Sequence, residues 1–258
     1  MMDFINYHIL NRIAYIELNR PEKRNALNPE LVISLIDSFA KANQDQDVKV
    51  IVLKAKGDVF SAGADLGYLQ QLQSNTYEEN VADSSALKDL FYTIYTSPKA
   101  VIAQVEGHAI AGGCGLASVC DIVFSVPEAK FGYTEVKIGF IPALVACFLV
   151  RKTGEARTKE LLLSGELIDA STASTYGLIN FICDKDSIRE DVKTYAEKLV
   201  SGTSAQSVSL TKQLLNLAQN MTLEESLDEA VNFNANARAT ADCKRGIAAF
   251  LSKEKITW

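Results

Sequence analysis

The sequence predicts an α/β fold, built from strands that alternate with helices and followed by a helical C-terminal region. Residues 48–53 and 100–105 are nearly continuous apolar runs of strand length, which is typical of strands covered on both faces. Helix-forming segments separate these runs, and strands that alternate with helices pair in parallel through crossover connections. After Ser187, amphipathic helices follow one another without a convincing strand. We therefore expect a parallel sheet early in the chain and helices at its end.

The first half of the chain contains clear element boundaries. Residues 13–18 alternate between polar and apolar positions, which predicts a strand. Asn28 followed by Pro29 predicts the start of a helix, because Asn caps the first turn and Pro suits the first helical position. Residues 68–97 are polar and helix-prone, and we expect them to be mobile.

Residues 100–121 run from an apolar strand into a cluster of glycines and then into small or apolar residues, as a tightly packed buried helix requires. The first N–H groups of a helix lack partners within it, and glycines let a ligand approach them closely, so this turn is suited to bind a partial negative charge. The alternative is that Gly112, Gly113 and Gly115 only permit close packing of backbone on backbone. Neither nucleotide-binding motif fits, because no Gly-Lys-Ser/Thr follows and the third glycine of the dinucleotide fingerprint is missing.

The second half of the chain begins with a further predicted strand at residues 122–126. Asp169 predicts a capped helix, and a short strand is expected to end at Cys183. We expect the chain to divide into a core at residues 1–186 and a helical region at residues 187–258. The helical region is expected to pack on the sheet or on another subunit.

The composition excludes several classes of function. A chain of 258 residues with 48% hydrophobic content can bury a sizeable core. A net charge of −6 argues against nucleic acid or an anionic membrane as the main partner, no apolar run is long enough to span a bilayer, and residues 1–20 alternate, unlike a secretory signal. The five cysteines are widely spaced without a C-x-x-C pair, which is typical of buried thiols in a reducing compartment. Since the two histidines show no zinc spacing, we expect a cytoplasmic enzyme without a metal.

Six segments occur in an order and spacing that match a known family. They are RPEKRNAL at 20–27, FSAGADL at 60–66, GHAIAGGC at 107–114, CD at 120–121, FGYTE at 131–135 and GFIP at 139–142. Through them the chain resembles the crotonase superfamily, the enoyl-CoA hydratases and isomerases, over nearly its whole length. The resemblance implies a spiral of ββα repeats with a C-terminal helical region that builds trimers, often paired into hexamers.

The resemblance also implies a site for an acyl-CoA thioester. The backbone N–H groups of Ala64 and Gly112 would form an oxyanion hole that stabilises the enolate of the thioester. No separate cofactor is expected, because coenzyme A is part of the substrate. Phe250 and Lys253 would reach the coenzyme A adenine from a neighbouring subunit. The full set of implied substrate contacts is Arg24, Ala26, Ala62, Ala64, Asp65, Leu66, Gly112, Phe250 and Lys253.

Glu135 is the candidate catalytic acid and base. Hydratases of the family usually carry two glutamates; the second lies at the position of Glu135, whereas Gly115 occupies the position of the first. Burial among apolar residues would raise the pKa of Glu135, which suits proton transfer near neutral pH. Without the motif, Glu135 would be interpreted as an exposed loop acid.

A single glutamate leaves more than one reaction open. The stretch that follows Gly132 is similar to bacterial hydratases of branched, methylglutaconyl-CoA-like substrates, and Gly115 would leave room for a branched acyl chain. We therefore expect hydration of a branched 2-enoyl-CoA, with Δ3,Δ2-enoyl-CoA isomerisation as the alternative. Non-catalytic binding of an acyl-CoA or of RNA stays as a further alternative. The presence of Glu135 disfavours a non-catalytic acyl-CoA binder, and the acidic net charge disfavours an RNA-binding protein.

Three other polar residues are expected to have structural roles. His108 precedes the glycine turn, and no serine or acid is placed to complete a triad with it, so we expect it to be hydrogen-bonded in place. Asp121 is expected to anchor a strand, and Asp65 to order its own loop through backbone N–H groups.

Overall fold

The strands form two sheets in which most neighbouring strands are parallel. The computed structural model describes residues 4–258, so the first three residues of the predicted core lie outside the described part. Within it, the larger sheet has the order β1-β2-β3-β5-β7-β10 and the smaller sheet the order β4-β6-β8-β9. Only the pairs β1–β2 and β8–β9 of these described strands are antiparallel. The strands are β1 (Ile5–Leu10), β2 (Ile13–Leu18), β3 (Val50–Ala55), β4 (Val59–Ser61), β5 (Ala100–Val105), β6 (His108–Ile110), β7 (Ile122–Ser125), β8 (Lys130–Gly132), β9 (Ile168–Asp169) and β10 (Phe181–Ile182).

A repeating β-β-α unit builds both sheets, as the resemblance to the crotonase superfamily implies. In each unit the first strand joins the larger sheet, the second joins the smaller sheet, and helix follows. The units are β3-β4 with α2 and α3, β5-β6 with α4, and β7-β8 with α5, so the chain winds as a spiral. The helices are α1 (Pro29–Gln44), α2 (Leu66–Leu72), α3 (Tyr77–Tyr95), α4 (Gly112–Ser118), α5 (Ala143–Ser164), α6 (Ala170–Thr175), α7 (Ile188–Gly202), α8 (Ala205–Ala218), α9 (Leu223–Ala239) and α10 (Ala241–Ser252), with 3-10 turns η1 (Pro21–Lys23) and η2 (Glu135–Ile138).

Local sequence signals place several elements correctly. The strands predicted at residues 13–18 and 100–105 are β2 and β5, and every residue of β5 is buried, which explains its continuous apolar sequence. The glycine stretch differs from the prediction: part of it forms β6, and α4 begins at Gly112, within the cluster of glycines rather than after it. The reason is that β6 pairs with both β4 and β8, and no local pattern encodes that pairing.

The predicted helix caps are present. The Asn28 side chain accepts a hydrogen bond from the Leu31 N–H at 3.0 Å, and Pro29 is the first residue of α1. Asp169 caps α6 in the same way, by accepting from the Thr172 N–H at 2.8 Å. Polar side chains at these positions therefore fix where the two helices begin.

The prediction that the cysteines are buried free thiols is confirmed only in part. All five are free thiols, and Cys114 and Cys120 are buried. Cys147 is exposed, so the prediction of a buried thiol is wrong there, because this residue lies on the side of α5 opposite the buried Val145. None of the described helices is both long and apolar enough to cross a membrane.

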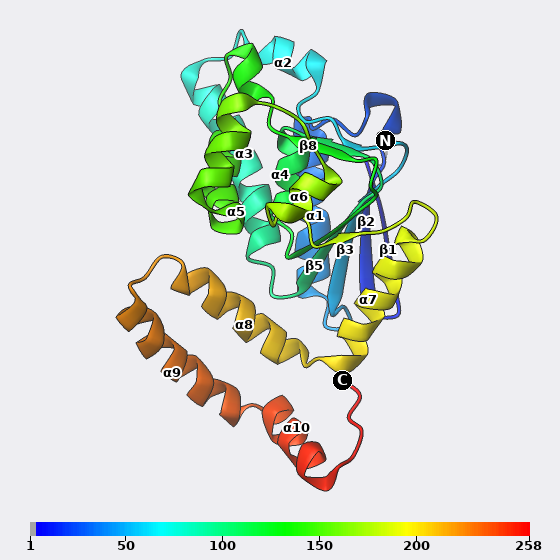
Figure 1. Ribbon diagram of the computed structural model, residues 1–258, viewed down its shortest axis with the longest axis vertical. Coiled ribbons are helices and arrows are strands. Elements are labelled where there is room, and N and C mark those ends of the chain that lie inside the picture. Colours follow the sequence, from blue (N-terminus) through cyan, green and yellow to red (C-terminus); the bar gives the residue numbers. More distant parts are fainter. Residues whose placement is uncertain (1–3) are drawn as a thin grey trace.

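The helices after residue 187 are of two kinds. Helix α7 packs on the larger sheet through Ile188, Val192 and Ala196, which are fully buried. Helices α8, α9 and α10 contain no buried residue and extend away from the sheets (Figure 1). We call these three helices, residues 205–252, the arm, and the described chain up to the end of α7, residues 4–202, the body.

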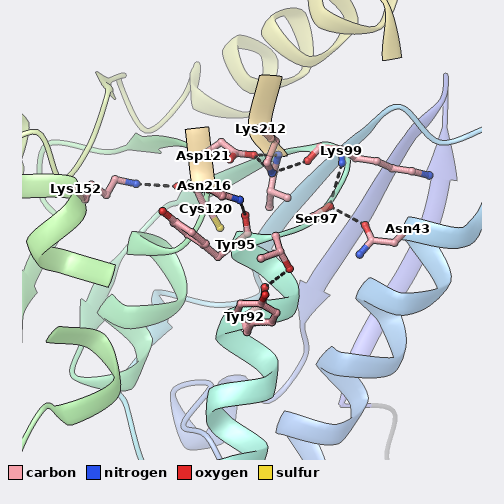
Figure 2. Close-up of polar contacts among 12 residues, drawn as sticks. Asn43, Tyr92, Tyr95, Ser97, Lys99, Cys120, Asp121, Lys152, Lys212 and Asn216 are labelled. Carbon is pink, nitrogen blue, oxygen red and sulfur yellow. Dashed lines mark hydrogen bonds and ion pairs between the residues drawn. The ribbon is translucent and has the colours of Figure 1, made fainter. Parts of the chain in front are cut away.

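Polar contacts attach the arm to the body (Figure 2). Lys212 on α8 donates to the Asp121 carboxylate at 2.6 Å and to the Lys99 carbonyl at 2.8 Å. Nearby on the same helix, Asn216 donates to the carbonyl of Tyr95 at 3.5 Å. The arm is therefore seated on the ends of α3, β5 and β7 by hydrogen bonds and one ion pair, without a buried apolar side chain of its own.

Candidate active site

A buried asparagine fixes the loop at residues 20–27. Asn25 is fully buried, and its backbone adopts the left-handed conformation with φ 52°. Its amide donates to the carbonyls of Lys56 and Val59 at 2.9 and 2.8 Å, and its own carbonyl accepts the Ser61 hydroxyl at 2.8 Å. These bonds join the loop to β4, which explains why this motif carries an asparagine.

The end of this loop pairs with a second loop, between β4 and α2, that carries Ala64 with its backbone N–H unpaired. Leu27 and Ala64 form an isolated parallel bridge, in which Leu27 donates to the Gly63 carbonyl at 2.6 Å and accepts from the Asp65 N–H at 2.9 Å. Both bonds fall on the neighbours of Ala64, so the Ala64 N–H points away from Leu27. Within the described chain, no protein acceptor binds this N–H.

Gly112 supplies a second unpartnered N–H at the same place. It is the first residue of α4, where a helix has no acceptor for its own N–H. Ala111 before it has φ 51° and ψ −126°, a conformation that is strained for a residue with a side chain and is held by a hydrogen bond to the Gly132 carbonyl at 2.8 Å. A Cβ built on Gly63 would lie 3.5 Å from the Gly112 nitrogen, so the loop that carries Ala64 touches this turn. Two backbone donors thus converge from separate repeats.

Gly113 and Gly115 serve close packing instead. A Cβ at Gly113 would lie 2.4 Å from the Ser61 carbonyl oxygen. At Gly115 it would lie 2.6 Å from Cγ1 of Val145 and 2.9 Å from Cζ of Phe91. The expectation that Gly115 leaves room for a branched acyl chain is therefore wrong, because the side chains of Phe91 and Val145 already fill that space.

Glu135 brings a carboxyl group to the site. It is the first residue of η2 and is half-buried. Its Oε2 atom is buried and has no hydrogen-bond partner among the described residues. Burial raises the pKa of Glu135 above its ordinary value of 4.5, against a smaller lowering by its own backbone N–H. The expected burial is confirmed, whereas the catalytic role stays a prediction.

Ala64, Gly112 and Glu135 line one pocket, which has a volume of about 770 Å³. Ala62 and Leu66, two of the residues expected to contact substrate, line it as well. Most of the lining is apolar and comes from α2, α3, η2 and the start of α5. Two unpartnered N–H groups and a carboxyl group with a raised pKa in one apolar cavity are suited to polarise a carbonyl and to move a proton beside it.

The other expected contacts lie outside this pocket. Ala26 is buried and Arg24 is exposed on the adjacent loop, and Asp65 is buried beside Ala64. Phe250 and Lys253 lie at the end of α10, far from the pocket helices α2 and α3 in Figure 1. Within a single chain, the last two residues therefore do not meet the pocket.

The residues expected to be structural make the expected kinds of contact. Asp65 accepts two backbone N–H groups of α2 at 2.8 and 3.2 Å and pairs with Arg20 at 2.7 Å. His108 accepts a backbone N–H of β8 at 3.1 Å through Nδ1. Asp121 accepts the Val101 N–H at 2.7 Å and so anchors the start of β5.

Sequence reasoning missed the helical wall of the pocket. Residues 68–97 are helical, as predicted, but the sequence indicated only a polar and mobile segment there and not that it lines much of the cavity. The available signal was the spacing of apolar residues along α3, which follows one face of a helix. The lining residues of α3 are Glu79, Ala82, Asp83, Ser84, Ala86, Leu87 and Phe91.

Comparison with known proteins gives consistent matches along the chain. The sequence model of the family described as "Enoyl-CoA hydratase/isomerase" matches residues 8–258. A Thermus thermophilus protein named "Putative enoyl-CoA hydratase" is 44% identical over 241 residues, which cover 93% of this chain and 95% of that protein. The crotonyl-CoA hydratase of Syntrophomonas wolfei is 32% identical over 253 residues, covering 96% and 94%. The crystal structure of an enoyl-CoA hydratase from Shewanella pealeana has a TM-score of 0.94 at 27% identity, with 99% of this chain and 96% of that chain covered.

Proposed function

Since the chain belongs to the enoyl-CoA hydratase/isomerase family, we propose that this enzyme adds water across the 2,3 double bond of an enoyl-CoA thioester. One observation carries the proposal. The unpartnered, buried Oε2 of Glu135 shares a single apolar pocket with the free backbone N–H groups of Ala64 and Gly112.

The two N–H groups are proposed to hold the thioester oxygen. As water adds at Cβ, negative charge moves onto that oxygen, and donors that are already in place stabilise it without reorganisation. Removing one such donor typically costs about 3–4 kcal/mol of transition-state stabilisation. Backbone donors suit this task because the strained turn at Ala111 and the bridge at Leu27 fix their directions.

Glu135 is proposed to perform both proton transfers. Its carboxylate takes a proton from water as the water oxygen bonds to Cβ, and the double-bond electrons move to the enolate oxygen. The enolate then collapses as Cα takes the proton back from Glu135, which restores the carboxylate. The raised pKa of Glu135 supports this cycle, because a base with a pKa nearer neutrality accepts and returns a proton more readily.

The acyl chain is proposed to lie against α2 and α3, where the pocket wall is apolar. We retain a branched acyl group as the favoured substrate, because the pocket of about 770 Å³ is wide and is lined by leucine, isoleucine, phenylalanine and alanine side chains. Gly115 itself provides no room for the branch, because the side chains of Phe91 and Val145 fill the space beside it.

Isomerisation between 3-enoyl-CoA and 2-enoyl-CoA is the second candidate. The observation that favours it is the absence of a second carboxylate near Gly115 in the described structure, where the neighbours are Phe91 and Val145. Moving a proton between Cα and Cγ needs one base, whereas hydration also needs a positioned water.

We further propose that the enzyme works in the cytoplasm as a homotrimer or as a hexamer of two trimers. The exposed apolar residues of the arm support assembly, because such residues are usually covered by a partner. In such an assembly Phe250 and Lys253 of one subunit would reach the coenzyme A bound to another.

The test is incubation with a branched 2-enoyl-CoA, with crotonyl-CoA and with a 3-enoyl-CoA in oxygen-labelled water, followed by mass analysis. Hydration predicts a labelled 3-hydroxyacyl product, formed faster from the branched 2-enoyl-CoA than from crotonyl-CoA, whereas conversion of the 3-enoyl substrate alone, without label, favours isomerisation. Glu135→Gln should lower kcat at least about 10²-fold with binding retained. Glu128→Gln is the matched control, since Glu128 is an exposed acid outside the pocket.

A further inference from the structure

The pocket walls carry charge of one sign only. Among its described lining residues, the charged ones are Glu79, Asp83 and Glu135, and no lysine, arginine or histidine reaches it. A carboxylate placed inside would lose its water shell and meet no cation in exchange. Burying an unpaired charge in this way is costly, and like charges nearby add to the cost.

Tyr68 fixes the negative charge of Asp83 on the pocket wall. The Tyr68 hydroxyl on α2 donates to the Asp83 carboxylate on α3 at 2.5 Å, and both residues line the pocket. Burial, followed by the neighbouring Asp83 carboxylate, raises the pKa of Tyr68 well above its ordinary value. The phenol therefore keeps its proton at neutral pH, and the pair as a whole carries the charge of Asp83.

Glu79 is fixed one helical turn before Asp83. Its Oε2 atom accepts the Thr76 N–H at 2.7 Å in a capping box at the start of α3. Neither carboxylate can turn away from a ligand without losing a hydrogen bond. Half-buried Asp83 and exposed Glu79 thus place two negative charges along the wall that is otherwise suited to an apolar chain.

We propose that Asp83, assisted by Glu79, is a specificity-determining residue that excludes acyl chains ending in a carboxylate. The inference rests on the proposed function, because it assigns the pocket to the acyl chain of a thioester. The sequence led us to expect a substrate like methylglutaconyl-CoA, which has both a methyl branch and a terminal carboxylate. We propose that the enzyme accepts the branch but excludes the carboxylate. The acyl group selected is uncharged and apolar.

Binding of unreactive thioesters tests this without requiring turnover. Butyryl-CoA and glutaryl-CoA differ by a terminal carboxylate, and calorimetry on the full-length protein should give a Kd at least about tenfold higher for glutaryl-CoA. The same order is expected for kcat/KM with crotonyl-CoA against glutaconyl-CoA. Equal values, or a preference for the carboxylated member, would overturn the proposal.

Three variants separate charge from structure. Asp83→Asn keeps an acceptor for Tyr68 but removes the charge, and it should reduce the butyryl-to-glutaryl preference about three- to tenfold. Tyr68→Phe breaks the hydrogen bond but keeps the carboxylate, so the preference should persist. Glu78→Gln removes an exposed charge beside Glu79 that does not line the pocket, and it should change neither Kd. A preference that is unchanged in Asp83→Asn would contradict the role of that residue.

The outcomes also distinguish this proposal from the proposed function. If glutaryl-CoA binds weakly but no thioester is hydrated, the exclusion stands and hydration fails. If crotonyl-CoA and glutaconyl-CoA are hydrated equally well, hydration stands and the exclusion fails.

Discussion

The body and the arm of this protein are stabilised by different interactions. The body buries large side chains completely, including Phe39, Phe60 and Phe91, in one continuous core. The arm buries none of its residues and exposes large apolar ones, such as Leu223 and Leu227. Its helices nevertheless have regular caps, including a capping box at the start of α9.

This difference indicates which function each region suits. Catalytic geometry needs groups held to within fractions of an ångström, and only close packing on all sides provides that. The arm has local helix signals and polar contacts to the body but no core, so the burial of its apolar residues requires a partner. We therefore expect changes in the body to affect chemistry and changes in the arm to affect assembly.

The largest expected effect lies in the body. Gly112→Pro removes the proposed N–H donor, and turnover of crotonyl-CoA should fall about 10²–10³-fold. Gly112→Ala is the control, because it keeps the N–H and its Cβ would meet only Cδ1 of Leu27 at 3.1 Å. Circular dichroism checks that both variants fold, and light scattering checks that assembly is unchanged. Near-normal turnover in a folded Gly112→Pro protein would refute the oxyanion hole.

The second effect is a pH dependence of kcat/KM that arises from Glu135, a residue of the body. Burial raises the pKa of Glu135 above 4.5, and its carboxylate is the active form, so kcat/KM should fall about tenfold per pH unit below that raised value. The folded protein also holds this proton more tightly than the unfolded chain does. Its contribution to the free energy of unfolding is therefore present at low pH and is lost as pH rises from 4.5 through the raised pKa. A profile that stays flat down to pH 4.5, in protein shown to be folded, contradicts the assignment.

The third effect is confined to the arm. Leu227 and Val231 lie one helical turn apart on α9 and are 59% and 67% exposed. Replacing both by Asp should reduce the mass measured by light scattering from that of a trimer to that of a monomer. Leu163→Asp on α5 of the body, at a residue 75% exposed, is the matched control and should leave the mass unchanged. A wild-type protein that is monomeric at micromolar concentration would refute the proposed assembly.

The smallest effect concerns the contact between the two regions. Lys212→Met breaks the partly exposed ion pair with Asp121 and the hydrogen bond to the Lys99 carbonyl, and it should lower the free energy of unfolding by about 1 kcal/mol. Lys88→Met breaks an ion pair with Asp89 in which both side chains are more than half exposed, and it should cost less than about 0.5 kcal/mol. Chemical denaturation measures both. Equal losses would show that the Lys212 pair does not secure the arm.

Sequence signals were sufficient where a few neighbouring residues decide the conformation. The apolar run of β5 and the cap at Asn28 predicted their elements because burial pattern and capping are local. They failed at β6, whose three residues are a strand only because β4 and β8 lie on either side. Local sequence also cannot distinguish the roles of the clustered glycines. Gly112 leaves a backbone N–H donor unpaired, whereas Gly115 lacks a side chain so that Phe91 and Val145 can pack against its backbone.

By itself, the sequence determined that strands alternate with helices, and it contains the family motifs and the residues that could carry the chemistry. Tertiary structure alone decided which of them meet. Ala64, Gly112 and Glu135 come from three separate repeats and share a pocket only because the spiral places equivalent turns side by side. The free volume near Gly115 and the sign of charge on the pocket wall depend on side chains of α3 and α5, which lie far along the chain from one another. Neighbouring residues in the sequence determine the backbone angles of a segment. The shape and charge of a cavity depend instead on side chains from all the elements that surround it.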